Sequence, residues 1–93
     1  MKWSAPEAFE RGRFSTQSDI WSFGVVLWEI FTYGKHPYPE LSNKEVIEKI
    51  PGGYRMTPPA ICPEDIKLLM MQCWEYDPHA RPTFQVNPKF FFF

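Results

Sequence analysis

Two cysteines and two histidines are the side chains in this 93-residue sequence whose chemistry is easiest to recognise. Cys62 and Cys73 lie eleven positions apart, and His36 and His79 stand alone, so no second cysteine or histidine completes a metal-ligand spacing. Zinc sites need several such ligands at close spacing, and disulfides persist in oxidising compartments. We therefore expect two reduced, partly buried thiols and no metal site, with a zinc site or a disulfide as the alternatives.

Charge and composition exclude several classes of protein. The ten Lys and Arg and eleven Asp and Glu give a net charge of −1, which leaves no basic patch for nucleic acid and no polybasic segment for a membrane surface. A helix-turn-helix binder would need a Lys/Arg-rich recognition helix, which is absent. The length suits one small domain, and the ten prolines divide the chain into short helices and turns. We expect an all-α, loop-rich fold without a signal peptide or a transmembrane segment.

The stretch 15–34 is the segment long and apolar enough to form the centre of such a fold. Thr16 precedes Asp19 by the three positions of a capping box, and Gly34 is placed to end the helix. The segment is apolar on all sides but is too short to cross a bilayer, so it should lie in a globular core. The stripe expected to face inward comprises Ile20, Phe23, Leu27, Ile30 and Phe31.

Shorter helices are expected near both ends of the chain. The first should cover residues 5–10, with Ser4 as the N-cap and Glu7 at the third position of a capping box. The last should run over residues 63–74, with Pro63 as its first helical residue. Helical spacing predicts that the last helix buries Ile66, Leu69, Met70 and Cys73.

A third short helix is predicted over residues 43–50, because Ser42 and Glu45 have capping-box spacing. Its expected buried face comprises Val46, Ile47 and Ile50. The tail 87–93 ends in four phenylalanines and fits no amphipathic pattern. We interpret it as a truncation or reading-frame scar outside a domain of residues 1–86, the alternative being a membrane or packing anchor.

Five motifs, in order and spacing, resemble the helical C-terminal lobe of a protein kinase over about residues 2–86. They are Lys2-Trp3-Ser4-Ala5-Pro6-Glu7, Ser18-Asp19-Ile20-Trp21-Ser22-Phe23-Gly24, Pro37-Tyr38-Pro39, Cys73-Trp74 and Arg81-Pro82-Thr83-Phe84. The tyrosine kinase branch is favoured over serine/threonine kinases by Lys2-Trp3, Trp28-Glu29-Ile30-Phe31 and Tyr54-Arg55-Met56.

The resemblance implies roles for three residues far apart in the sequence. Glu7 would be the glutamate that ends the activation segment, and it would form a structural ion pair with Arg81 in bidentate geometry. Asp19 would accept hydrogen bonds from the backbone of the catalytic loop. Without the resemblance, Glu7 and Arg81 are unrelated surface charges and Asp19 is an acidic residue in a first helical turn.

The resemblance also implies that Lys2, Trp3 and Ser4 belong to the substrate-binding loop, beside the residue that follows the target tyrosine. The family's reaction transfers the γ-phosphoryl group of ATP with the help of Mg²⁺. Its glycine-rich loop, His-Arg-Asp and Asp-Phe-Gly motifs do not occur in these 93 residues, and Gly52-Gly53 has the wrong context for a phosphate cradle. We therefore expect no catalytic residue here and no phosphate transfer by this chain alone.

Two functions remain in competition. In the first, a full-length tyrosine kinase parent phosphorylates tyrosine in protein or peptide substrates, and this chain is its substrate-side scaffold. Its partners would be that substrate and the remainder of the kinase domain, in the cytoplasm or on the cytoplasmic side of a membrane receptor. In the second, the lobe is a non-catalytic interaction module that binds through residues 35–43 and the following helix.

Without its neighbours, the long helix should lose burial at Phe23 and Leu27, leaving a partly ordered or aggregating chain.

Overall fold

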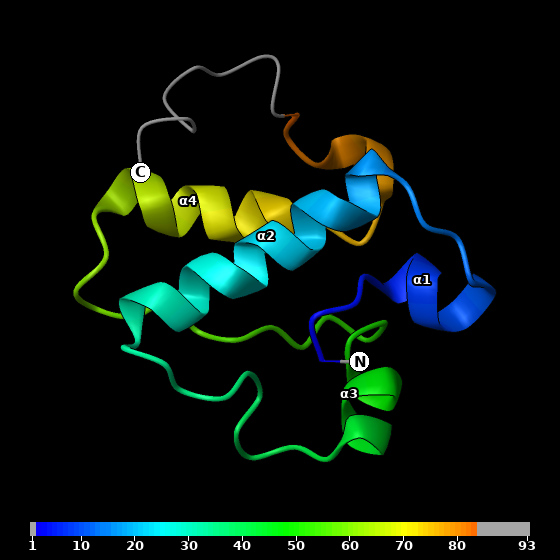
Figure 1. The fold of residues 1–93 in the computed structure, drawn as a ribbon, viewed down its shortest axis with the longest axis horizontal. Helices are drawn as coiled ribbons and strands as arrows, with labels where there is room; N and C mark the ends of the chain where they lie inside the picture. The colour runs from blue at the N-terminus through cyan, green and yellow to red at the C-terminus, as the bar shows by residue number, and fades with distance from the viewer. Residues whose placement is uncertain (1, 84–93) are drawn as a thin grey trace.

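The computed structural model describes residues 2–83, and all regular secondary structure in this range is helical (Figure 1). The expected all-α fold is confirmed. No helix within residues 2–83 is long and apolar enough to cross a membrane. The tail 87–93 lies outside the described residues. The helices are α1 (Pro6–Arg11), α2 (Thr16–Phe31), α3 (Asn43–Lys49), α4 (Glu64–Cys73) and the 3₁₀ helix η1 (Pro78–Ala80).

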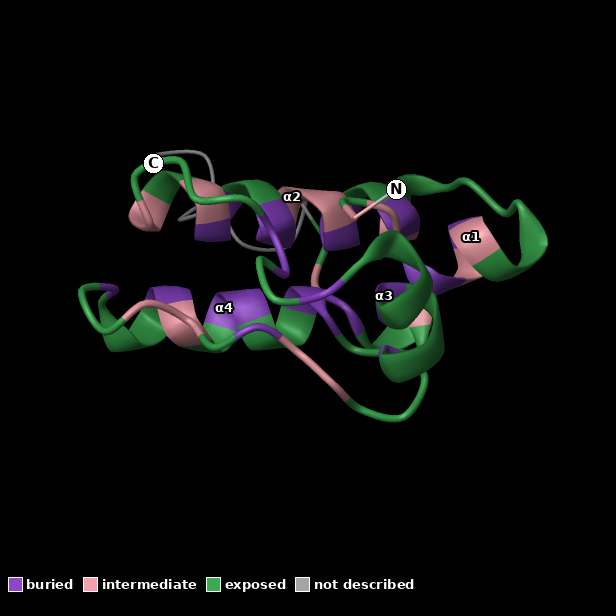
Figure 2. Cartoon of the chain, turned by 90° about the horizontal axis from the view of Figure 1, so that it is seen from below, coloured by how far each residue is buried: buried purple, intermediate pink, exposed green. Residues whose placement is uncertain are grey.

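The core forms where α2 crosses α4, and the buried residues of the two helices face one another (Figures 1 and 2). The helices approach closely at Gly24, where an added Cβ would lie 2.7 Å from Cys73 Cβ and 2.8 Å from Trp74 Nε1. A side chain at this position would therefore push the helices apart. The predicted inward face of α4 is confirmed, since Ile66, Leu69, Met70 and Cys73 are all buried.

The predicted inward stripe of α2 is wrong in part. Ile20 and Leu27 are buried, but Ile30 is 61% exposed, and Phe23 and Phe31 are only partly buried. A helix that is apolar all round gives no periodic signal for one face, so the packing partner decides which face is covered. The expectation that Leu27 would lose its burial is also wrong. The face that completes the core carries Trp21, Gly24, Val25 and Trp28.

The capping box of α2 lies one residue earlier than predicted. Ser15, not Thr16, is the N-cap, and its Oγ accepts a 3.3 Å hydrogen bond from the backbone N–H of Ser18. The Ser18 Oγ in turn accepts from the Ser15 N–H at 2.6 Å, which completes the reciprocal pair. Serine at the third position can replace the usual acidic residue because its short hydroxyl reaches back to the cap. Asp19 is left free to point into solvent, where it is exposed.

Tyr33 ends α2 in a left-handed conformation that usually belongs to glycine. Its φ is 59°, and its N–H donates to the carbonyl of Ile30. Gly34 follows with φ 90°, and its N–H donates 2.9 Å to the carbonyl of Glu29. This pair of bonds is the Schellman pattern, in which the left-handed position is normally a glycine. The predicted stop at Gly34 is therefore one residue beyond the strained position.

Replacing Tyr33 with glycine is expected to stabilise the chain by about 1 to 2 kcal/mol, the usual cost of a left-handed L-residue. The gain should survive because the Tyr33 side chain is 85% exposed and loses little packing. Thermal unfolding should show a midpoint higher by several degrees. Tyr33→Ala is the matched control, since it removes the ring but keeps the Cβ. An equal gain in both variants would contradict the explanation.

The predicted caps of the other helices are confirmed in part. The capping box at Ser42 and Glu45 is confirmed, although Ile47 is 42% exposed while Val46 and Ile50 are buried. Pro63 is the N-cap of α4 rather than its first helical residue. The predicted Ser4 cap of α1 is wrong, because Ala5 is the N-cap and receives no side-chain hydrogen bond. Glu7 is therefore not part of a capping box, and its carboxylate is used elsewhere.

Candidate functional site

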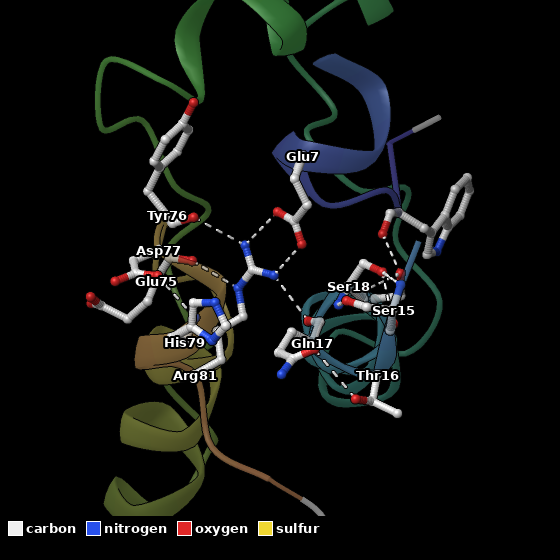
Figure 3. Close-up of polar contacts among 12 residues, drawn as sticks. Glu7, Ser15, Thr16, Gln17, Ser18, Glu75, Tyr76, Asp77, His79 and Arg81 are labelled. Atoms are coloured by element: carbon white, nitrogen blue, oxygen red, sulfur yellow. Dashed lines mark hydrogen bonds and ion pairs between the residues drawn. The ribbon is translucent and has the colours of Figure 1, made fainter. Parts of the chain in front are cut away.

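Glu7 and Arg81 meet in a bidentate ion pair although 74 residues separate them in the sequence (Figure 3). Arg81 Nη1 donates to Glu7 Oε2 at 2.7 Å, and Nη2 donates to Oε1 at 2.9 Å. The Arg81 side chain is fully buried, and that of Glu7 is 13% exposed. Two parallel charge-assisted bonds in a dry site fix both the distance and the orientation of the pair.

Arg81 uses all five of its N–H donors. Besides the two bonds to Glu7, Nη1 donates to the carbonyl of Gln17 at 2.9 Å. Nη2 donates to the carbonyl of Tyr76 at 3.3 Å, and Nε donates to that of Glu75 at 2.8 Å. A guanidinium has five N–H groups, so no donor is left without a partner. One side chain therefore joins α1, the first turn of α2 and the segment that follows α4 (Figure 3).

Two guanidinium groups lie close to the ring of Trp21 on α2. The Cζ atoms of Arg55 and Arg81 are each 5.1 Å from its ring centroid, which is cation–π distance. Arg55 also donates to the carbonyl of Trp74 at 2.7 Å and to that of Ile50 at 2.9 Å, at the ends of α4 and α3. Burial lowers the pKa of Arg55. Sequence reasoning assigned Arg55 no role; its signal is a lone arginine between Tyr54 and Met56 in a proline-rich loop.

The protonation of Glu7 is set by opposing effects. Burial raises the pKa of its carboxyl group, but hydrogen bonds from Arg81 and from its own backbone, with the charge of Arg81, outweigh burial and lower the pKa from its ordinary value. The ion pair is therefore intact at neutral pH. It acts as a structural clamp between distant parts of the chain.

The segment 2–4 is held against α2 and the loop that follows it. Lys2 Nζ donates to the carbonyls of Tyr38 at 3.2 Å and Leu41 at 2.6 Å. Trp3 Nε1 donates to Glu29 Oε1 at 2.5 Å, and the Trp3 carbonyl accepts from the hydroxyl of Ser22 at 2.7 Å. The indole of Trp3 is still 39% exposed, and the adjacent Ser4 is partly buried. The segment is thus fixed in backbone position while a large aromatic surface stays accessible.

The groups that could act as nucleophiles or metal ligands are poorly placed for chemistry. Cys62 and Cys73 are free and buried, and burial raises the pKa of Cys73 to about 12. Such a thiol is protonated and unreactive at neutral pH. Among residues 2–83, no three His, Cys, Asp or Glu side chains are grouped to hold a metal ion.

The structure places the sequence-predicted site residues at three separate positions. Glu7 and Arg81 form the clamp, the segment 2–4 lies on α2, and Asp19 is exposed in the first turn of α2. The role of Asp19 as an anchor for a catalytic loop stays a prediction. Sequence reasoning also missed the hydrogen bonds between Tyr76 and Glu10, which join α1 to the segment after α4.

Comparison with known proteins identifies the family. The family model described as protein tyrosine and serine/threonine kinase matches residues 1–89. The megakaryocyte-associated tyrosine-protein kinase of Rattus norvegicus is 56% identical over 85 residues, covering 91% of this chain and 18% of the relative. The tyrosine-protein kinase transforming protein Fps of Fujinami sarcoma virus is 55% identical and tyrosine-protein kinase Fer of Homo sapiens 52% identical, each over 84 residues, 90% of this chain and 10% of the relative.

The chain thus spans between a tenth and a fifth of the length of these curated relatives. The matched stretch contains the clamp, the segment 2–4 and the five helices found among residues 2–83. The helical fold agrees with the C-terminal lobe expected from the motifs. The chain belongs to the protein tyrosine and serine/threonine kinase family, in its tyrosine kinase branch, and corresponds to part of the helical C-terminal lobe.

Proposed function

We propose that this chain is the substrate-side scaffold of a protein-tyrosine kinase whose whole domain transfers the γ-phosphoryl group of ATP, with Mg²⁺, to tyrosine in protein substrates. The observation that carries the proposal is the attachment of segment 2–4 to α2 by side-chain and backbone hydrogen bonds. A loop that orients a peptide must itself be held rigidly, because small displacements of a reacting group are costly in rate. Lys2, Trp3 and Ser4 are the residues proposed to line the peptide site.

The ion pair between Glu7 and Arg81 supports this role by fixing α1, the helix that follows segment 2–4. Arg81 ties α1, which follows the proposed peptide-binding segment directly, to the start of α2 and to the segment after α4. Segment 2–4 is therefore braced at both of its neighbours, by α2 on one side and by α1 on the other. In this proposal the ion pair between Glu7 and Arg81 acts on catalysis only by positioning.

The apolar surface left open on α2 supports a second partner, the remainder of the kinase domain. Val26 and Ile30 are 42% and 61% exposed, and Phe23 and Phe31 are partly buried. Exposed apolar side chains on one helix are typical of a surface that another segment covers. Asp19 is exposed on the same helix, and we propose that it accepts hydrogen bonds from a catalytic loop docked there.

The pure 93-residue chain is expected to show no ATP-dependent phosphorylation of a tyrosine peptide. A chimera should restore it, in which the chain is preceded by the part of the rat megakaryocyte-associated kinase that lies before the matched segment. Transfer should need ATP and Mg²⁺ and should spare a serine version of the peptide. Activity of the chain alone would contradict the scaffold proposal. A folded but inactive chimera would contradict the kinase function.

The interaction module stays the second candidate, and the surface around residues 35–43 and α3 favours it. His36, Glu40 and the α3 residue Ile47 are exposed there. Binding of a substrate protein to the chain alone, with an inactive chimera, would select this alternative. For the location in the cell we propose the cytoplasm or the cytoplasmic face of a membrane, where the buried thiols of Cys62 and Cys73 would stay reduced.

A further inference from the structure

Tyr76 links two segments at the edge of the clamp. Its hydroxyl donates to the carboxylate of Glu10, with distances of 2.7 and 2.8 Å to Oε1 and Oε2. Its carbonyl accepts from Arg81, while its ring points away from the guanidinium (Figure 3). We propose that Tyr76 is a tyrosine phosphorylation site, and that its phosphate exchanges Glu10 for Arg11 and Arg13 as partners.

Accessibility limits the candidates to two of the four tyrosines. Tyr38 is 1% exposed, and Tyr54 is partly buried, so both are less accessible. Tyr33 is 85% exposed and Tyr76 is 47% exposed, so both can be reached by an enzyme. Of these two, Tyr76 is the one that lines a hollow with charged walls.

The hollow contains cations suited to a phosphate. It is formed by the end of α1, the loop that leads to α2, and the segment around η1, and the cationic residues Arg11 and Arg13 line it. The salt bridges within residues 2–83 join Arg81 to Glu7 and Lys67 to Glu64, which leaves Arg11 and Arg13 unpaired. Arginine side chains hold phosphate through paired charge-assisted hydrogen bonds.

The acidic groups of the hollow differ in how far they would oppose a phosphate. The Glu7 carboxylate is occupied by Arg81, and Asp77 Oδ1 accepts a 2.9 Å hydrogen bond from the backbone N–H of His79. Glu10 faces Tyr76 directly, and its carboxylate accepts the hydrogen bond of the Tyr76 hydroxyl, which phosphorylation removes. Repulsion is therefore concentrated on Glu10, which is exposed and can turn into solvent.

The chemical step is transfer from ATP by a tyrosine kinase. The bond between the γ-phosphorus and the bridging oxygen breaks, a bond forms between that phosphorus and Tyr76 Oη, ADP leaves, and the hydroxyl proton passes to the base of the kinase. The product carries a charge of about −1.5 to −2 and donates no proton to Glu10. The link from α1 to the segment after α4 is thereby broken and replaced by contacts to the arginines.

The test treats the folded 93-residue chain with an active tyrosine kinase domain, ATP and Mg²⁺, so it does not depend on any activity of the chain itself. Peptide mass spectrometry should locate phosphate on Tyr76, and Tyr76→Phe should abolish that signal. Glu10→Gln should speed modification of Tyr76 several-fold, because the neutral amide holds the hydroxyl less strongly. Glu48→Gln, an exposed change on α3, is the matched control and should leave the rate unchanged.

Phosphorus NMR tests the new partners. The second pKa of the Tyr76 phosphate should lie below its usual value of about 6 and return to it in Arg11→Gln/Arg13→Gln, whose folding is checked by circular dichroism. Phosphate at Tyr33 serves as the internal reference. Modification of Tyr33 without Tyr76, or a Tyr76 phosphate whose titration ignores both arginines, would overturn the proposal.

Discussion

Replacing Glu7 with glutamine is expected to lower the free energy of unfolding of the 93-residue chain by about 3 to 5 kcal/mol. The amide has nearly the same shape, but it leaves the Arg81 guanidinium buried with no negative charge beside it, in a side chain that is fully shielded from solvent. Most of that cost is the penalty for an unpaired buried charge. Domains of this size are stable by about 5 to 14 kcal/mol, so one substitution would remove about a fifth of the total or more.

Urea unfolding followed by tryptophan fluorescence measures the effect, since Trp21 lies against Arg81. Glu48→Gln makes the same chemical change at an exposed position of α3 and should cost no more than about 0.5 kcal/mol. A loss below 1 kcal/mol for Glu7→Gln would mean that the pair is in effect solvated. A non-cooperative transition in the wild-type chain would support the expectation of a partly ordered chain instead.

The same pair predicts the response of the wild-type chain to acid. The pKa of Glu7 is lower in the folded chain than in the unfolded chain, so the folded state binds its proton less readily. The stabilisation is then present above the unfolded pKa of Glu7 and is lost as the pH falls through the lower folded pKa. Glu7→Gln should lack this part of the acid response, while Glu48→Gln should retain it. This comparison separates Glu7 from the other carboxylates.

The sequence motifs predict the two charged residues of the clamp but not the backbone carbonyls that bind the other N–H groups of Arg81. Glu7 and Arg81 were paired through motifs in register, and their bidentate contact is present in the structure. The carbonyls of Gln17, Glu75 and Tyr76, which take the remaining donors of Arg81, could not be foreseen, because backbone acceptors carry no sequence signal. Buried polar groups must find partners, but which backbone supplies them is decided by tertiary packing.

The buried faces of the helices also differ in how well the sequence predicts them. The amphipathic α4 has one apolar stripe, so its buried residues were predicted correctly. The predicted stripe of the all-apolar α2 is wrong in part, because nothing in the local sequence marks which side of this helix α4 will cover. Gly24 is the local signal that marks the contact with α4. A glycine inside a helix lowers the stability of the helix, so its presence there indicates that another segment packs closely against it.

Replacing Gly24 with alanine is therefore expected to destabilise the chain by about 1 to 3 kcal/mol, the usual cost of overpacking a core. On propensity alone this change inside α2 should stabilise by about 1 kcal/mol. The new Cβ, however, would lie 2.7 Å from Cys73 Cβ, an atom fixed by the backbone of α4 that cannot rotate away. The sign of the measured change thus decides between local propensity and helix contact.

Two further variants isolate the contact. Gly52→Ala adds the same methyl group where its nearest neighbour is the Lys49 carbonyl at 3.5 Å, an ordinary contact, and should change stability by less than 1 kcal/mol. Combining Gly24→Ala with Cys73→Gly removes the clashing Cβ, so the double variant should lose less than the sum of the single losses. Strictly additive losses would show that α2 and α4 do not meet at these two atoms. That result would contradict the packing of α2 against α4 described above.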